Sequence, residues 1–168
     1  AGPDWPNPPW STFLLRELLA SDEFRIDFIN RYADLINSSF RSDRVLEQID
    51  QKKDLILSEI PGHCARWGGD IWQWLNNIQV MRDFATYRKN HAQNHVIQYF
   101  DLTEDSEVTL DVYPEQAGKI QISTLNIDNF PWSGEYFNGV PVKITAIANP
   151  GYRFIRWEGG NTSDSSEI

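Results

Sequence analysis

Two histidines at helical spacing, His91 and His95, are the residues whose types most directly suggest chemistry. Side chains at i and i+4 lie on one face of a helix, where they could share a metal ion. A metalloprotease helix also needs Glu directly after the first His, and Ala92 holds that position. A third ligand would have to come from a distant residue such as His63 or Asp101. The pattern therefore favours surface or capping histidines over a metal site.

A thiol nucleophile is the second candidate, because His63 directly precedes Cys64. Adjacent residues on a helix point about 100° apart, so this pair cannot readily share a proton. Cys64 also falls on an apolar helical stripe, which favours a buried structural thiol. It is the only cysteine, so no intrachain disulfide can form, and cysteine content does not determine the redox compartment.

Glycines and carboxylates provide no further site. The pairs Gly68-Gly69 and Gly159-Gly160 lack the Lys-Ser/Thr of a phosphate loop and the three-glycine dinucleotide spacing, so we interpret them as a helix stop and a strand-end turn. Carboxylates are plentiful, but no pair stands in an apolar setting that the sequence alone identifies. The sequence therefore assigns no catalytic residue, no cofactor-binding residue and no metal ligand.

An aromatic cluster, WSGEYF, runs from Trp132 to Phe137. Its pattern favours the core of a β module, and a sugar-stacking platform is the alternative. Mutation of Trp132 and Tyr136 combined with a glycan-binding assay would separate the two interpretations.

The elements that must position these residues begin with a helix between Ser21 and Phe40. Its apolar positions recur at spacings of three and four: Phe24, Phe28, Tyr32, Leu35 and Ile36. Its polar positions are expected on the other faces: Asp27, Asn30, Arg31 and Asp34. Ser21 can cap the helix, and the acidic residues that follow suit the dipole of the first turn.

Shorter segments flank this helix on its N-terminal side. Residues 1–9 form a Pro/Trp-rich arm, which cannot be helical and which Trp5 and Trp10 are expected to pin to the body. A short helix is expected over residues 13–19. We expect three of its side chains to point inward: Phe13, Leu14 and Leu18.

Two longer helices are expected next. The first is capped by Ser42, is kinked at Pro61-Gly62 and ends at Gly68-Gly69. Its inward stripe is Val45, Leu46, Ile49, Ile56 and Ile60, and Cys64 and Trp67 keep the spacing. The second runs from about Asp70 to Tyr87, with an inward stripe of Ile71, Trp74, Ile78, Met81 and Phe84.

A separate helix is expected to restart at Asn90. Its side chain can cap, and Gln93 occupies the matching capping-box position. The side chains expected to face inward are Val96, Ile97 and Phe100.

After Thr103 the hydrophobic period changes from helical to alternating. Strands are expected over about 108–113, 120–123, 140–146 and 152–155. The expected turn signals are Pro114, Gly118, Asn138-Gly139 and Pro150-Gly151. The fold class that follows is α+β: an N-terminal helical array and a small antiparallel β module.

Composition limits the partners. The chain has 168 residues and a net charge of 15 − 24 = −9, which argues against nucleic acid and anionic membranes because both reward clustered Lys and Arg. No apolar run of about 18 residues is present, so no membrane span is expected. The start, AGPDWPNPPW, lacks a signal-peptide layout and is typical of a piece of a longer chain.

The order of several separated segments resembles the C-terminal helical part of the spore-coat CotH kinase family, over about Trp10 to Leu102. The matching strings are WSTFLLRELLASDEFRIDFINRYADLINSSF, SDRVLEQID, IPGHCARWG, MRDFATYR and HVIQYFDL. The chain departs from the family pattern at Lys89-Asn90, where Arg-Pro is expected.

This resemblance implies a parent that is an atypical protein kinase, which uses ATP and a divalent metal such as Mg to phosphorylate Ser or Thr on secreted or surface proteins. The family's catalytic carboxylates lie before the stretch matched here, so no catalytic residue is carried over. The implied partner is an upstream kinase lobe of the same chain.

The segment from Gly118 to Gly160 resembles bacterial surface modules of the internalin B-repeat type. The matching strings are GKIQIS and GVPVKITAIANPGYRFIRWEGG, with Arg156 in place of the usual glycine before Trp157. The resemblance implies a spacer or adhesion unit outside the cytoplasm.

Together these observations predict an arm (1–9), a helical part of a CotH-like kinase (10–103) and a β module (104–168). The expected function is non-catalytic support of a CotH-type kinase lobe, with no cofactor in this part, at the bacterial surface or outside the cell. The alternative is a surface module that binds glycan or protein through its β part, and a purely structural spacer is a third interpretation.

Overall fold

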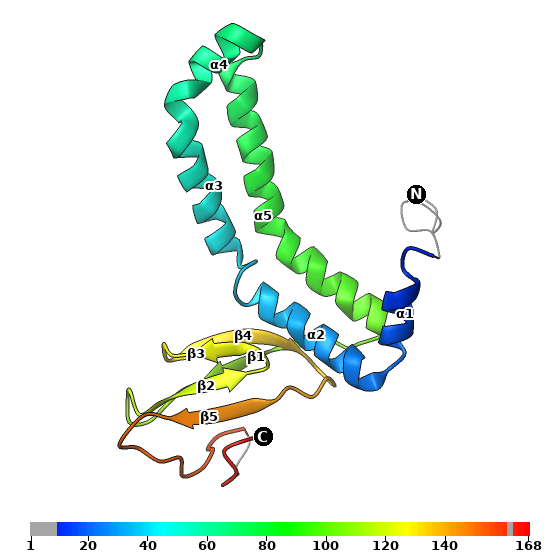
Figure 1. Ribbon diagram of the computed structural model, residues 1–168, viewed down its shortest axis with the longest axis vertical. Helices are drawn as coiled ribbons and strands as arrows, with labels where there is room; N and C mark the ends of the chain where they lie inside the picture. Colours follow the sequence, from blue (N-terminus) through cyan, green and yellow to red (C-terminus); the bar gives the residue numbers. More distant parts are fainter. Residues whose placement is uncertain (1–9, 161–162) are drawn as a thin grey trace. The chain divides into compact units, whose positions relative to one another are not determined.

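The structure is a computed structural model that describes residues 10–160 and 163–168 (Figure 1). Helices precede strands, and the change falls after Leu102, which confirms the α+β fold class. The chain folds into two compact units: one combines the chain up to Asp34 with the chain from Thr103 onward, and the other spans Leu35–Leu102. The expected arm, with Trp5, lies outside the described residues. The predicted domain boundary near residue 103 stays a prediction.

The Leu35–Leu102 unit is a helical hairpin. It contains α3 (Ser42–Ile56), the 3₁₀ turn η1 (Leu57–Glu59), α4 (Ile60–Trp67) and α5 (Ile71–Phe100). Figure 1 shows α3 and α5 side by side, with α4 at the closed end of the hairpin. Arg41, rather than Ser42, occupies the N-cap of α3 and makes no side-chain cap, so the expected Ser42 cap is wrong.

The kink predicted at Pro61-Gly62 lies earlier, at η1. Proline cannot donate an N–H, and its ring clashes with the carbonyl four residues before it, here that of Leu57. The helix therefore breaks over residues 57–59, and Pro61 falls in the first turn of α4, where a missing N–H does no harm. Gly68, with φ 81°, ends α4 as predicted.

The second long helix does not restart at Asn90. Asp70 caps α5 by accepting a hydrogen bond from Trp72 N at 3.1 Å, and the helix then continues without a break to Phe100. Lys89-Asn90 contains no proline, and an interior Asn costs a helix only about 0.7 kcal/mol. Packing can offset this small cost, so the helix continues through Asn90. Gln93 is buried in the helix interior and is not a capping residue.

The expected inward stripe of α5 is only half right. Ile71, Trp74 and Ile78 are half-buried, but Met81 and Phe84 are 52% and 64% exposed. The buried positions further along are Ala85, Ala92, Gln93 and Val96. Trp67 and Ile56 are also exposed, against expectation.

The other unit begins with α1 (Phe13–Leu19) and α2 (Asp22–Ile36). Helix α1 matches its predicted range, whereas α2 ends at Ile36 and not near Phe40 as predicted. Ser21 Oγ accepts from Phe24 N at 3.5 Å, which confirms the cap. The inward positions expected in α1 are wrong, since no residue of this seven-residue helix is buried. Trp10 is 80% exposed, so it does not pin the chain.

Helix α2 buries a different face from the one expected. Ile29 and Ala33 are buried, and so are the two polar residues Asn30 and Asp34. The expected apolar positions are half-buried, apart from Ile36, which is buried. A helix buries a polar face only where partners satisfy it, and these partners come from the β part of the same unit.

The strands form two small antiparallel sheets. In one, β1 (Asp105–Leu110) pairs with β4 (Trp132–Phe137). In the other, β2 (Gly118–Ile122) lies between β3 (Leu125–Ile127) and β5 (Ile144–Ala148). Residues 166–168 extend this sheet: Ile144 N donates to Ile168 O at 2.8 Å, and Ile168 N donates back at 2.9 Å.

Several strand bounds differ from prediction. The strand expected from Val140 begins at Ile144, because Pro141 has no N–H for a ladder. Residues 152–155 form no strand among the described residues, where a bridge between Trp157 and Ser163 and the packing of Phe154 on Trp157 hold the segment. The turns at Asn138-Gly139 and Pro150-Gly151 are confirmed.

Gly118 is not a turn residue. It begins β2 opposite Ala148, and a Cβ there would lie 2.6 Å from the backbone oxygen of Ile147. The close approach of two strands therefore explains this glycine. The centre of the sheet is formed by Ile120 and Ile122, which are 2% and 0% exposed, and each is worth roughly 1.5–3 kcal/mol of burial.

Candidate functional site

The most organised polar site surrounds Asp34, which is fully buried at the end of α2. Its Oδ2 accepts from Ser123 Oγ at 2.8 Å, from Thr124 N at 3.0 Å and from Thr124 Oγ1 at 2.7 Å. Its Oδ1 accepts from Tyr136 OH at 2.7 Å. These donors come from the β2–β3 turn and from β4. We call Asp34, Ser123, Thr124 and Tyr136 the Asp34 junction.

Two neighbours on α2 extend this junction. Arg31 Nη1 donates to Thr124 Oγ1 at 2.5 Å, so this hydroxyl accepts from Arg31 while it donates to Asp34. Asn30 Nδ2 donates to Pro141 O at 2.7 Å, whereas its buried Oδ1 has no hydrogen-bond partner among the described residues. Three polar residues within five positions of one helix therefore contact the β part, Arg31 and Asp34 at the β2–β3 turn and Asn30 at the segment before β5.

The chemistry of the junction is structural. A buried carboxylate is costly unless donors surround it, and hydrogen bonds to a charged group are worth about 1.5–3 kcal/mol each. With both oxygens of Asp34 held by donors, the carboxylate is positioned to fix the backbone rather than to take a proton from a substrate.

A groove of about 640 Å³ opens beside the junction. One wall is α2, with Ile26, Asp27, Asn30 and Arg31, and the other walls are residues 123–124, 141–143 and 167–168. Lys143 Nζ and Glu167 Oε2 form an ion pair of 2.8 Å at its rim, where both side chains are more than half exposed. Exposed pairs of this kind contribute little to stability.

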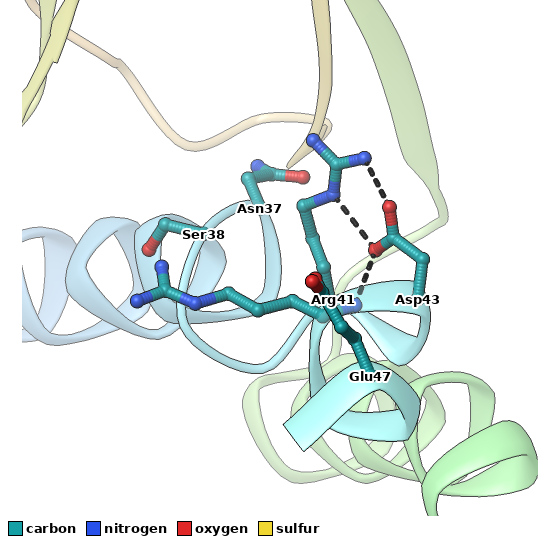
Figure 2. A pocket seen from close by; sticks show the side chains of 6 residues that line it. Asn37, Ser38, Arg41, Asp43 and Glu47 are labelled. Carbon is teal, nitrogen blue, oxygen red and sulfur yellow. Dashed lines mark hydrogen bonds and ion pairs between the residues drawn. The ribbon is translucent and has the colours of Figure 1, made fainter. Parts of the chain in front are cut away.

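A smaller pocket of about 330 Å³ lies at the start of α3 (Figure 2). Figure 2 shows Arg41 facing Asp43, with contacts of 3.1 and 2.6 Å, and Asp43 Oδ1 also accepts from Arg44 N at 2.9 Å. The hydrogen bonds from Arg41 lower the pKa of Asp43. Because Asp43 and Glu47 match the charges of Arg41 and Arg44, the pocket is no phosphate cradle.

An ion pair joins α3 to α5. Arg82 Nη1 contacts Asp50 Oδ1, and Lys53 Nζ lies 3.6 Å from the same oxygen and 3.1 Å from Asp54. The hydrogen bond from Arg82 lowers the pKa of Asp50, and the hydrogen bond to Asp54 raises the pKa of Lys53. These charges stabilise the packing of the hairpin and do not converge on a cleft.

The residues singled out by sequence do not come together. His91 and His95 are exposed on α5, and His63 is exposed on α4. In the part of the chain that the structure describes, no group of three or more His, Cys, Asp or Glu is arranged to hold a metal ion. Cys64 is a half-buried free thiol, less buried than expected.

The aromatic cluster is β4, and the core interpretation is confirmed for two of its members. Tyr136 and Phe137 are each 4% exposed, and Trp132 is half-buried. Tyr136 cannot stack on a sugar, because its ring is buried. No described helix is both long enough and apolar enough to span a membrane.

Sequence reasoning missed the Asp34 junction. It placed Asp34 and Asn30 away from the buried face, because acidic and amide side chains are usually solvated. The available signal was the spacing itself: Ile29, Asn30, Ala33 and Asp34 are at i, i+1, i+4 and i+5, which is one continuous helical face.

The fold and this junction define a class of protein: a helical scaffold whose second helix is hydrogen-bonded into an antiparallel β module. Residues 1–92 match the family model of the CotH kinase protein, and the chain belongs to the CotH kinase family. Residues 108–168 match the divergent InlB B-repeat domain. No curated protein and no solved structure matches the chain significantly. Asp34 thus lies in the first matched region, and its donors lie in the second.

Proposed function

We propose that this chain is the distal helical part of a CotH-type protein kinase. It supports the kinase lobe without supplying catalytic residues, and it carries the β module as an accessory unit at the bacterial surface. Membership of the CotH kinase family supports this role, and one surface of α5 is the observation that carries it.

That surface is a second apolar face of α5. Val80, Phe84 and Tyr87 are 59%, 64% and 62% exposed, and their spacing of four and three residues puts them on one side of the helix. The residues that pack in the hairpin, such as Ala85 and Ile78, fall on the opposite side. A large apolar stripe of this kind marks a surface that another protein part covers. We assign it to the kinase lobe, and call Val80, Phe84 and Tyr87 the outer stripe.

The parent enzyme would use ATP and a divalent metal for phosphoryl transfer. The described residues do not fit such a metal, since none of their acidic, His or Cys side chains form a group of three. We therefore assign no step of phosphoryl transfer to them, and the proposed contribution of this chain is support alone.

The direct test of the non-catalytic role uses this chain with ATP and Mg²⁺. We expect no ATP hydrolysis and no Mg²⁺-dependent change in Tm on adding ATP. Measurable turnover that survives repurification would overturn the proposal.

The support role is tested in a protein that joins this chain to a CotH kinase lobe. Phe84→Glu should expose the lobe to limited proteolysis, because it places a charge in the proposed contact. Thr86→Glu is the matched control, since Thr86 is exposed on the same helix but lies away from the outer stripe. Equal protease resistance in both variants would contradict the role.

Surface adhesion is a second candidate, favoured by the match of residues 108–168 to the B-repeat domain. The exposed aromatics Tyr113 and Tyr152, 97% and 50% exposed, are the side chains available to a glycan. A glycan array separates the candidates: specific hits that Tyr113→Ala or Tyr152→Ala abolishes support adhesion, and an empty array favours kinase support.

A further inference from the structure

The B-repeat region contains a turn whose two central residues are unusual for its geometry. Ser123 and Thr124 join β2 to β3 as a two-residue hairpin loop, since Ile122 pairs directly with Leu125. Such loops favour Asn-Gly or Gly-containing pairs, because their backbone requires positive φ. Ser123 has φ 48°, a conformation that a side chain with a Cβ disfavours.

The β part itself holds the backbone of Ser123, whose N–H donates to Lys143 O at 2.9 Å and whose carbonyl accepts from Gln121 Nε2 at 3.2 Å. The hydroxyls of the turn are held from α2. One carboxylate oxygen of Asp34 accepts from both hydroxyls of this turn and from the backbone N–H of Thr124. In ordinary turns, an Asn or Asp within the turn accepts such bonds. Here the acceptor is 89 positions away from Ser123 in the sequence.

Further contacts hold the same helix face. Tyr136 brings β4 to the other oxygen of Asp34, Arg31 binds Thr124, and Asn30 binds the carbonyl of Pro141. Ile29 and Ala33, 2% and 1% exposed, bury the apolar part of this face. The contacts therefore reach the β2–β3 turn, β4 and the segment before β5.

We propose that α2 is an integral part of the B-repeat module, and that Asp34 shapes the β2–β3 turn from the kinase-family part of the chain. The module is then not an independent domain joined to the helices by a flexible linker. The face of α2 formed by Asn30, Arg31 and Asp34 is an interaction surface whose partner is the module of this same chain, so the module moves with α2. This inference does not depend on the kinase-support role.

Amide hydrogen exchange of the full chain tests the proposal, with Asp34→Asn as the variant. The loss of a charged acceptor should speed exchange at Thr124 and in β2 and β3 by about tenfold or more. Exchange in α3 and α5 should stay within about twofold, because these helices form the other compact unit. Asp27→Asn is the control, since Asp27 is an exposed carboxylate on the same helix.

Equal exchange in the Asp34 and Asp27 variants would overturn the proposal, and so would acceleration spread evenly over α3 and α5. Should Asp34→Asn fail to fold, Thr124→Val decides, because it keeps the side-chain shape and removes the hydroxyl that donates to Asp34 and accepts from Arg31. It should speed exchange in the same strands by a smaller factor.

A cleavage experiment gives an independent readout. A protease site inserted between Leu102 and Thr103 and then cut would leave α2 and the module without a covalent link through α5. We expect the two pieces to co-elute in size-exclusion chromatography, and to separate once Asp34→Asn is introduced. Separation of the cut but otherwise unchanged chain would overturn the proposal.

Discussion

Tyr136 donates its phenolic hydrogen bond to Oδ1 of Asp34 at 2.7 Å, and so links β4 to α2 across 102 positions of sequence. Both side chains are buried, at 4% and 0% exposure. A contact of this kind is strong because the acceptor is charged and water is excluded. Its removal should therefore be measurable without changing the shape of the site.

Tyr136→Phe makes that change, since it removes only the hydroxyl. We expect a loss of about 1.5–3 kcal/mol in the free energy of unfolding, measured by urea denaturation. Tyr113→Phe is the control, because Tyr113 is 97% exposed, and it should alter stability by less than about 0.5 kcal/mol. A loss in the Tyr113 variant as large as that in the Tyr136 variant would contradict the assignment.

The ion pair between Asp50 and Arg82 should make the hairpin sensitive to acid. The hydrogen bond from Arg82 lowers the pKa of Asp50 below its ordinary value of 3.8. A carboxyl with a lowered folded pKa stabilises the fold above its unfolded pKa, and this contribution is lost as pH falls through the folded pKa. Thermal unfolding of the native chain and of Asp50→Asn should therefore differ at neutral pH and converge well below pH 3.8.

The control for this pH profile is Asp83→Asn, which changes an exposed carboxylate of α5 that accepts from Gln79. Its difference in Tm from the native chain should vary less with pH. High salt should also reduce the effect of Asp50→Asn, because the pair is partly exposed. A difference in Tm between Asp50→Asn and the native chain that stays constant from neutral pH to well below pH 3.8 would rule the ion pair out as its source.

Two neighbouring residues of α5 should differ in how strongly substitution by leucine affects stability. Ala85 is 7% exposed, so Ala85→Leu inserts volume into a packed contact and should cost about 1–3 kcal/mol. Phe84 is 64% exposed, so Phe84→Leu should stay within about 0.5 kcal/mol. The free energies of unfolding of both variants test which face of α5 packs in the hairpin. The reverse order would mean that the outer stripe is the packed face.

Two glycines form a second contrasting pair. Gly118→Ala should destabilise the β part by about 1–3 kcal/mol, because the new Cβ meets a backbone oxygen at 2.6 Å. Gly62 lies inside α4, and a Cβ added there would meet no atom within 4 Å, so Gly62→Ala should stabilise by about 0.5–1 kcal/mol. Thermal unfolding of the two variants measures both signs. A stable Gly118 variant would mean that β2 and β5 separate more easily than their pairing indicates.

Local patterns predicted much of this fold. The range of α1, the start of α2 after Ser21, the start of α5 near Asp70 and the change to strands after Leu102 all follow from hydrophobic period and capping residues. The B-repeat and CotH resemblances were also confirmed by the family matches. These features depend on residues close together in sequence.

What the sequence could not predict depends on distant residues. The β2–β3 hairpin has Ser-Thr in its loop instead of Asn-Gly or another Gly-containing pair. The residue that stabilises this loop, Asp34, lies far away in the sequence on α2. The inward faces of α1 and α5 were misjudged because periodicity locates an apolar stripe but does not say what covers it. Continuity at Lys89-Asn90 was missed because a capping pattern does not prevent a helix from continuing.

The placement of Asp34 also limits how this architecture can be rebuilt. A chimaera that grafts a foreign repeat after Leu102 would leave a buried anion facing whatever loop the graft provides. Such a graft succeeds only if it brings hydroxyl and amide donors to the same positions, or if Asp34 is exchanged for an apolar residue at the same time. Compatibility between the two parts is therefore encoded in a few side chains rather than in the length of the linker.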